Sequence, residues 1–195
     1  RGEEVTGKMI ILDSVPANTG NDFTGVVRGE VVIHRDELSS RFKNTRNGVA
    51  GAISSSKVND ARDEKARFYA FDAPGVETDV MGRLERMGFT LAHSIPTSAS
   101  STFETVTQIL DNRENLPYDI DGVVVKVADA KVRAGLEDRT NTPRWAIAFK
   151  RAGETVTTKL LDVHFQVGKS GALGIVAILQ PVDLMGTTIS RATLH

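Results

Sequence analysis

The segments Asp119-Ile-Asp-Gly-Val-Val-Val-Lys126 and Trp145-Ala-Ile-Ala-Phe-Lys150 decide the fold of this chain. Each reads as a strand that ends on a lysine, a residue that does not belong in a strand core. Because alternate residues of a strand point to opposite faces, Lys150 shares its face with two alanines, and the three large apolar residues of its segment fill the other face. The alanines leave room for a ligand beside the cation, and Lys126 presents a second cation in the same way. Two such strands predict an anion site, most simply for a phosphate.

A third segment, Val26-Val-Arg-Gly-Glu-Val-Val-Ile33, follows the same design. Arg28 and Glu30 project together from an otherwise apolar strand, and the carboxylate could accept a hydrogen bond from a ribose hydroxyl or hold a metal ion. For any one of these segments, an edge strand with solvated charges explains the pattern equally well. Three of them in one chain favour a binding site.

The rest of the apolar pattern predicts an α+β fold. Ser101-Thr-Phe-Glu104 is a capping-box signature that opens a helix, and Gly88 marks the end of the helix before it. Strands are expected at Met9–Leu12, Arg67–Phe71, Val123–Val127 and Ala146–Phe149. Helices are expected at Asp36–Phe42, Thr78–Met87 and Ala128–Glu137.

Composition limits the classes of function. The chain has 195 residues, 40% of them hydrophobic, a formal net charge of −1 and no cysteine. No apolar run approaches the ~20 residues of a membrane span, so no membrane partner is expected. The absence of cysteine excludes disulfides within the chain and is compatible with a reducing cytoplasm. Because the charge is nearly balanced, binding to DNA would rest on local basic patches. The four histidines, which we expect to be structural or surface residues because they lack metal-ligand spacing, are His34, His93, His164 and His195.

The pattern changes at Arg151-Ala-Gly-Glu154, which reads as a polar turn. The residues beyond it predict three strands of a small barrel, at Val156–Gln166, Ala172–Val182 and Thr187–Thr193, with glycines in the turns. An OB-fold has five strands, so these three cannot close one. We therefore expect one domain over residues 1–152 and an incomplete OB-fold over residues 153–195.

Several ordered motifs carry a resemblance to a known family. Arg28-Gly-Glu30, Asp121-Gly-Val-Val-Val-Lys126 and Trp145-Ala-Ile-Ala-Phe-Lys150 resemble the nucleotidyltransferase motifs of bacterial NAD-dependent DNA ligases. Phe165-Gln-Val-Gly-Lys-Ser-Gly171 and Ser190-Arg-Ala-Thr-Leu-His195 resemble the opening of that family's OB domain. The resemblance covers essentially the whole chain. It implies a nucleotidyltransferase core of the ATP-grasp-like ligase type, built from antiparallel sheets with helices and followed by a partial OB-fold β-barrel.

The resemblance also implies a reaction. A lysine would take AMP from NAD, the AMP would pass to the 5′-phosphate of a nick in duplex DNA, and the 3′-hydroxyl would displace it. Negative charge develops in the transition state of each transfer, so positioning and electrostatic stabilisation dominate such catalysis. The implied cofactors are NAD, through its AMP moiety, and Mg²⁺.

The resemblance implies roles for particular residues of the matching motifs. Lys126 and Lys150 match the phosphate-binding lysines, and Asp121 matches the acidic residue that would act in catalysis and contact magnesium. Glu30 matches the carboxylate that engages the AMP ribose or the metal. Phe71 occupies the position of an aromatic residue that would stack on adenine, although a place in the core explains it equally well.

Four basic residues complete the implied site. Arg1 and Arg113 match arginines near the cofactor phosphates, and Arg46 matches an arginine near the nick, because guanidinium groups hold two phosphate oxygens at once. Lys169, in the OB-like motif, is expected to contact DNA.

Alternation raises a difficulty for Asp121, because it places this residue and Lys126 on opposite faces of one strand. If both serve one site, the strand must break near Gly122, the residue best able to allow a bulge.

The nucleophile of the family is missing from the sequence. It lies in a Lys-x-Asp-Gly motif, and the similar string Asp119-Ile-Asp-Gly122 lacks the lysine. The expected partner is therefore a preceding segment or a second subunit that carries the nucleophilic lysine and the nicotinamide-recognition module. The expected location is the cytoplasm of a bacterium or of a phage-infected bacterial cell.

Two other functions stay open at this point. The chain could be a non-catalytic nucleic-acid-binding or assembly subunit of a split ligase. It could also be a related ATP- or GTP-using nucleotidyltransferase, but the two OB-like strings argue against that class. The stretch Thr45-Arg-Asn-Gly-Val-Ala-Gly-Ala52 departs from the family's Asn-Pro-Arg-Asn-Ala-Ala-Ala-Gly-Ser, which concerns the DNA contacts more than the nucleotide pocket.

Overall fold

The computed structural model describes residues 2–20, 23–76, 78–136, 142–150, 153, 155–184 and 187–194. It divides the chain into two compact units, unit 1 from Arg1 to Arg151 and unit 2 from Ala152 to His195. Helices and antiparallel sheets are both present, so the predicted α+β class is confirmed. Within the described residues, no helix is long and apolar enough to cross a membrane.

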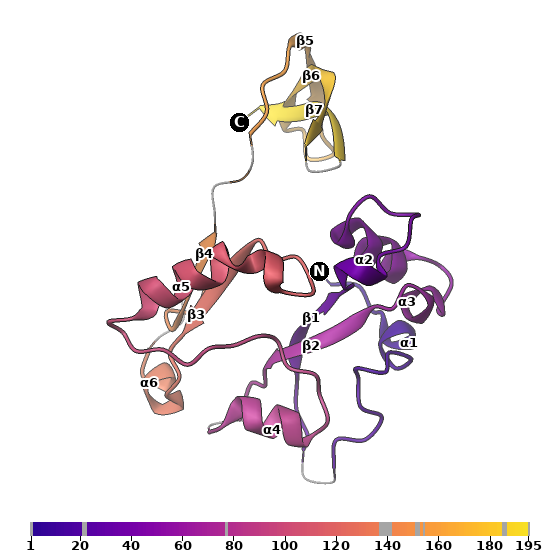
Figure 1. Ribbon diagram of the computed structural model, residues 1–195. Helices are drawn as coiled ribbons and strands as arrows, with labels where there is room; N and C mark the ends of the chain where they lie inside the picture. Colours follow the sequence, from indigo (N-terminus) through magenta and orange to yellow (C-terminus); the bar gives the residue numbers. More distant parts are fainter. Residues whose placement is uncertain are drawn as a thin grey trace. The chain divides into compact units, whose positions relative to one another are not determined.

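The first sheet of unit 1 pairs β1 (Arg28–Val32) with β2 (Arg67–Asp72), as Figure 1 shows. The register shifts between two neighbouring pairs, because Arg28 lies opposite Asp72 while Gly29 lies opposite Ala70. Phe71 is therefore the extra residue of a β-bulge, a feature that bends a strand and redirects a side chain.

Helices pack on both strands of this sheet. The helix α2 (Thr45–Ser54) lies against β1, and α4 (Val80–Arg86) lies against β2. Two clusters of buried side chains form the core, one around Leu12 and Ile33 and the other around Ala70 and Leu84. The smaller elements of this region are α1 (Thr6–Met9), η1 (Arg35–Glu37) and α3 (Asp60–Asp63).

The second sheet of unit 1 pairs β3 (Gly122–Lys126) with β4 (Ala146–Lys150) in an unbroken antiparallel register. The helix α5 (Thr102–Asp111) packs along β3 (Figure 1), and its Val106 is buried. The short elements η2 (Arg113–Asn115) and α6 (Ala130–Ala134) flank β3 in the sequence.

Unit 2 is a three-stranded antiparallel sheet in the order β5 (Leu160–Val167), β6 (Leu173–Leu184) and β7 (Thr187–Leu194). The three predicted strands are confirmed, and the described residues close no barrel. Gly171, in the turn before β6, has the positive φ of 80° that favours glycine. Gly186, the glycine expected in the next turn, lies outside the described residues.

Several local predictions are wrong, each for a physical reason. The expected strand at Met9–Leu12 is the end of α1 and the turn after it, because a short apolar run with Leu12 buried fits either structure. The expected helix at Asp36–Phe42 is only the 3₁₀ turn η1. Ser101 makes no side-chain cap, although the helix it precedes is present.

The helix α2 was not predicted. Its glycines lower helix propensity, but Gly48 and Gly51 let Leu38 and Phe42 approach so closely that an added Cβ would lie within 2.9 Å and 2.5 Å of those side chains.

Candidate functional site

The two predicted phosphate-binding lysines lie on the same face of the β3–β4 sheet. Lys126 is paired with Ala146, and Lys150 is paired with Gly122, and directly paired residues of an antiparallel sheet project to the same side. Four residues along a strand correspond to about 14 Å, so the lysines stand at opposite ends of this face. Val124 and Ala148, which lie between them, are both exposed.

The opposite face of this sheet is less covered than the sequence predicted. Trp145 and Phe149 are half-buried, but Ile147 is 60% exposed. The prediction that Ile147 packs in the core is therefore wrong.

Lys126 contacts the bulge of β2. Its Nζ donates to the carbonyl oxygen of Phe71 at 3.3 Å and lies 4.6 Å from the centre of the Phe71 ring. Burial lowers the pKa of Lys126 from its ordinary value; Asp72 opposes this effect, and the guanidinium groups of Arg133 and Arg28 add to it. An ammonium group that is partly stripped of water and faces a π system retains donors for an anion.

The bulge determines what Phe71 can do. The side chain is 36% exposed, and its ring faces the ammonium of Lys126. Phe71 is thus not a core residue, and its stacking on adenine stays a prediction.

Asp121 accepts from two cations at the other end of the face. Its Oδ2 lies 3.5 Å from Nζ of Lys150 and 3.3 Å from Nη2 of Arg46, which the N-terminal turn of α2 carries. All three side chains are more than half exposed. Because β3 begins at Gly122, Asp121 precedes the strand, and no bulge is needed for it to reach the side of Lys150.

Gly122 permits this arrangement. A Cβ there would lie 2.4 Å from the carbonyl oxygen of Phe149 and 2.9 Å from Cγ of Lys150. The aliphatic stem of Lys150 therefore occupies the space that any other residue at position 122 would need.

Glu30 and Arg28 differ in their surroundings, although the sequence predicted that they project together. Arg28 pairs with the buried carboxylate of Asp72 at 3.7 Å. Glu30 is exposed opposite Tyr69, and its carboxylate makes no hydrogen bond or ion pair with another described residue. It is therefore available to a ligand.

The magnesium-binding roles predicted for Glu30 and Asp121 stay predictions. Among the described residues, the one group with three potential ligand atoms within 4.8 Å of one another is His34, Asp36 and Glu37, which contains neither. Glu37 already pairs with two cations, Arg67 and Lys65. Glu30 and Asp121 nevertheless present exposed carboxylate oxygens, the type of ligand that Mg²⁺ prefers.

The remaining predicted residues lie in different places. Arg113 opens η2, and its Nε lies 3.5 Å from the carboxylate of Glu114. Lys169 is exposed in the turn between β5 and β6 of unit 2. Arg1 lies outside the described residues. The sequence analysis did not identify Arg35, Thr45 or the structural role of Asp119. Hydrogen bonds among these three residues and the backbone hold the segment that carries Arg113 and Asp121.

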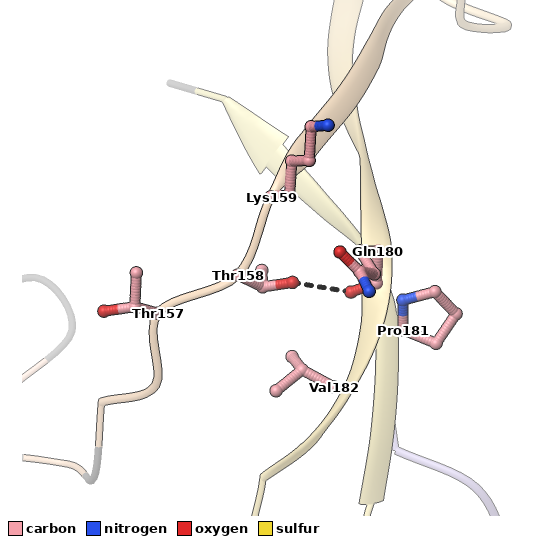
Figure 2. A pocket seen from close by; sticks show the side chains of 6 residues that line it. All are labelled: Thr157, Thr158, Lys159, Gln180, Pro181 and Val182. Atoms are coloured by element: carbon pink, nitrogen blue, oxygen red, sulfur yellow. Dashed lines mark hydrogen bonds between the residues drawn. The ribbon is translucent and has the colours of Figure 1, made fainter.

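Unit 2 also has a hollow of about 490 Å³. Thr158, one of the residues that line it, donates to the carbonyl oxygen of Gln180 at 2.7 Å (Figure 2). Lys159 is the one charged residue of its lining, and none of the predicted site residues contributes to it. Its lining residues are Thr157, Thr158, Lys159, Gln180, Pro181 and Val182.

Comparison with known proteins gives two family matches. Residues 1–154 match the model of the NAD-dependent DNA ligase adenylation domain, and residues 157–195 match that of the NAD-dependent DNA ligase OB-fold domain.

Curated relatives agree with these matches. The chain is 37% identical over 216 residues to the DNA ligase of Thermoanaerobacter sp. (strain X514), 32% identical over 214 residues to that of Clostridioides difficile, and 34% identical over 218 residues to that of Bacillus licheniformis. Each similarity covers 100% of this chain and 32% of the relative. The chain thus spans about a third of the length of the relatives it matches.

Proposed function

This chain belongs to the NAD-dependent DNA ligase family, and from this premise we propose that it forms the AMP- and phosphate-binding part of a ligase that seals nicks in duplex DNA. The reaction would proceed through lysyl-AMP and DNA-adenylate intermediates. The observation that carries the proposal is the pair of lysines on one open face of the β3–β4 sheet, with Arg46 beside the second lysine.

The two lysines have the chemistry that phosphoryl transfer needs. Charge grows on the phosphate oxygens and on the leaving group during each step, and a fixed ammonium stabilises that charge more than it stabilises the ground state. Lys126, whose pKa burial lowers, would gain an anion as its partner. At the other end of the face, a phosphate would compete with Asp121 for Lys150 and Arg46, which releases the carboxylate.

The released carboxylate suits Mg²⁺. This ion binds protein through one or two carboxylates together with substrate phosphates. Asp121 and Glu30 would therefore contribute ligands together with the phosphates of a bound nucleotide. When bound, the metal neutralises charge on the phosphates.

The other predicted residues would bind the rest of the substrate. Phe71 would stack on adenine, and Glu30 would also accept from the ribose. Arg1 and Arg113 would bind cofactor phosphates. Arg46 and Lys169 would bind the backbone of the nicked duplex.

The protein would act in the cytoplasm of a bacterial or phage-infected cell. The nucleophilic lysine would come from a preceding segment or a second subunit that also binds the nicotinamide half of NAD. The support for this is that no Lys-x-Asp-Gly string occurs in the sequence. Incubation of the chain alone with adenylate-labelled NAD should leave it unlabelled, and a stoichiometric adduct on any of its lysines would contradict this assignment.

The experiment that tests the function uses the complete ligase that contains this chain. Lys126→Ala and Lys150→Ala should each slow single-turnover sealing of a saturating nicked duplex about 100-fold, by analogy with the loss of one preorganised electrostatic donor. Nick binding and its dependence on salt should change little. Lys131→Ala, an exposed lysine on α6, is the matched control and should seal like the wild type.

A different result would identify these lysines as contacts to the DNA backbone. In that case sealing at saturation would stay near the wild-type rate, and the slope of log affinity against log salt would drop by about one for each variant. A wild-type protein that seals no nick would contradict the proposed function itself.

A further inference from the structure

Arg35 makes an unusually complete set of hydrogen bonds with the segment from 113 to 119. Its Nε donates to Oδ1 of Asp119 at 2.6 Å. Its two terminal nitrogens donate to four backbone carbonyls, at distances between 2.8 Å and 3.3 Å, those of Arg113, Glu114, Leu116 and Tyr118. A guanidinium has five N–H donors, so all of them can be used within this segment.

The backbone of Arg35 adds one more bond to the same segment, because its N–H donates to the carbonyl oxygen of Pro117 at 2.8 Å. Arg35 lies three residues after the end of β1, so the segment is attached to the chain close to the first sheet of unit 1.

Asp119 extends the attachment to a third part of unit 1. Its second oxygen, Oδ2, accepts a hydrogen bond from the hydroxyl of Thr45, a buried residue at the first position of α2. Burial would raise the pKa of Asp119, but the hydrogen bonds from Thr45 and Arg35 outweigh it, and the pKa lies below its ordinary value. An acid at this end of a helix also interacts favourably with the helix dipole.

The predicted site residues are the immediate neighbours of this network. Arg46 follows Thr45 on α2, and Asp121 lies two residues after Asp119. The carbonyl oxygen of Arg113 accepts a hydrogen bond from Arg35. Arg46 and Asp121 meet at 3.3 Å although both side chains are exposed, and an exposed ion pair has little tendency to hold such a geometry by itself.

We propose that Arg35, Asp119 and Thr45 are positioning residues, which hold the N-terminus of α2 against the 113–121 segment so that Arg46 reaches the phosphate beside Lys150 and Asp121. The inference rests on the proposed function, because it assigns these residues to that site. None of the three touches substrate: the donors of Arg35, both oxygens of Asp119 and the hydroxyl of Thr45 already have partners within the protein.

A double-mutant cycle between Thr45 and Arg46 tests this coupling. Thr45→Val keeps the shape of the side chain and removes the hydroxyl that reaches Asp119. In the complete ligase, it should weaken nicked-duplex binding or slow sealing by roughly 10-fold, the effect of losing one hydrogen bond to a charged group. In an Arg46→Ala background, the same substitution should change either quantity by less than about 2-fold, because a helix end that no longer carries Arg46 has nothing to position.

Three further variants make the result specific. Thr45→Ser keeps the hydroxyl and should restore most of the wild-type activity. Asp119→Asn keeps two polar atoms but loses the charge, and it should show the same dependence on Arg46 as Thr45→Val. Thr107→Val is the matched control, because the hydroxyl of Thr107 bonds only to the carbonyl of Phe103 within α5; it should behave like the wild type.

The outcomes separate this inference from the proposed function. If the wild type seals nicks but Thr45→Val has equal effects with and without Arg46, the residues act independently and the inference is wrong. Loss of activity in Thr45→Ser as large as in Thr45→Val would also overturn it, since the hydroxyl would then not be the cause. If Thr45→Val fails to fold, Asp119→Asn decides by the same comparison. If the wild type seals no nick, the proposed function fails and the inference falls with it.

Discussion

At the residue scale, Lys126 combines a positive charge with partial burial. Its pKa is lowered, chiefly by burial. The folded protein therefore binds this proton less tightly than the unfolded chain does. Lys126 thus opposes folding below its folded pKa, and this cost declines as pH rises above that value and is lost above the ordinary pKa of lysine. Catalysis has the opposite requirement, because only the charged form can stabilise a phosphate.

We therefore expect kcat/KM for NAD to fall as pH rises through the lowered pKa of Lys126, before an ordinary lysine would titrate. In Lys126→Arg the guanidinium stays charged, and the alkaline fall should move to higher pH. The measurement is the profile of kcat/KM against pH for the wild-type enzyme and for Lys126→Arg. An alkaline limb at the same pH in both would show that another group titrates there.

Gly122 is the other residue whose role the local geometry defines. A methyl group there would overlap the carbonyl of Phe149 and the stem of Lys150, so Gly122→Ala should lower the free energy of unfolding by about 1–3 kcal/mol. Gly135→Ala is the matched control, because its Cβ would lie 3.6 Å from the nearest atom. Urea denaturation compares them, and equal midpoints would contradict the expected clash.

At the scale of elements, α2 is held at both ends by charges that match its dipole. Asp119 accepts from Thr45 at the N-terminus, and the buried ammonium of Lys8 donates to the carbonyls of Ala52, Ile53 and Ser55 at the C-terminus. A helix fixed at both ends positions the backbone of Arg46 independently of the exposed ion pair between Arg46 and Asp121.

Removal of the cation at the C-terminal end should therefore loosen the whole helix. Lys8→Met keeps most of the side-chain volume but leaves these carbonyls without their donor, which should cost about 1–3 kcal/mol of unfolding free energy. Lys57→Met, at an exposed position close to the end of α2, should cost almost nothing. Chemical denaturation of both variants provides the comparison. Equal midpoints would mean that water replaces the ammonium fully.

The elements also show what the sequence could predict. Lys126 and Lys150 share a face because of alternation within each strand, and the unbroken pairing of β3 with β4 preserves it, so the pattern of each strand was enough. The bulge at Phe71 and the network of Arg35 could not be predicted in this way. The acceptors of Arg35 lie 78 to 84 residues away in the sequence, and no local pattern encodes a contact of that range.

At the scale of the whole molecule, the two units differ in how they bury apolar surface. Unit 1 has two clusters of buried side chains, whereas the buried hydrophobic residue of the described part of unit 2 is Ala177. Unit 2 leaves several large apolar side chains more than half exposed, among them Leu160, Leu161, Phe165, Val167 and Leu173. A three-stranded sheet with so small a core has little hydrophobic stabilisation of its own.

This surface leads to a prediction for the chain of 195 residues. Phe165 is 66% exposed, so Phe165→Thr should change the free energy of unfolding by less than about 1 kcal/mol, while a buried phenylalanine would cost about 3–5 kcal/mol on truncation. The same substitution should reduce the fluorescence of a bound hydrophobic dye, because it removes an exposed ring. Ala177→Asp is the contrasting variant: it places a charge without a partner at a position that is 3% exposed and should unfold the sheet. Denaturation and dye binding of the three proteins decide the matter, since a large loss of stability in Phe165→Thr would mean that this ring is packed in solution rather than exposed.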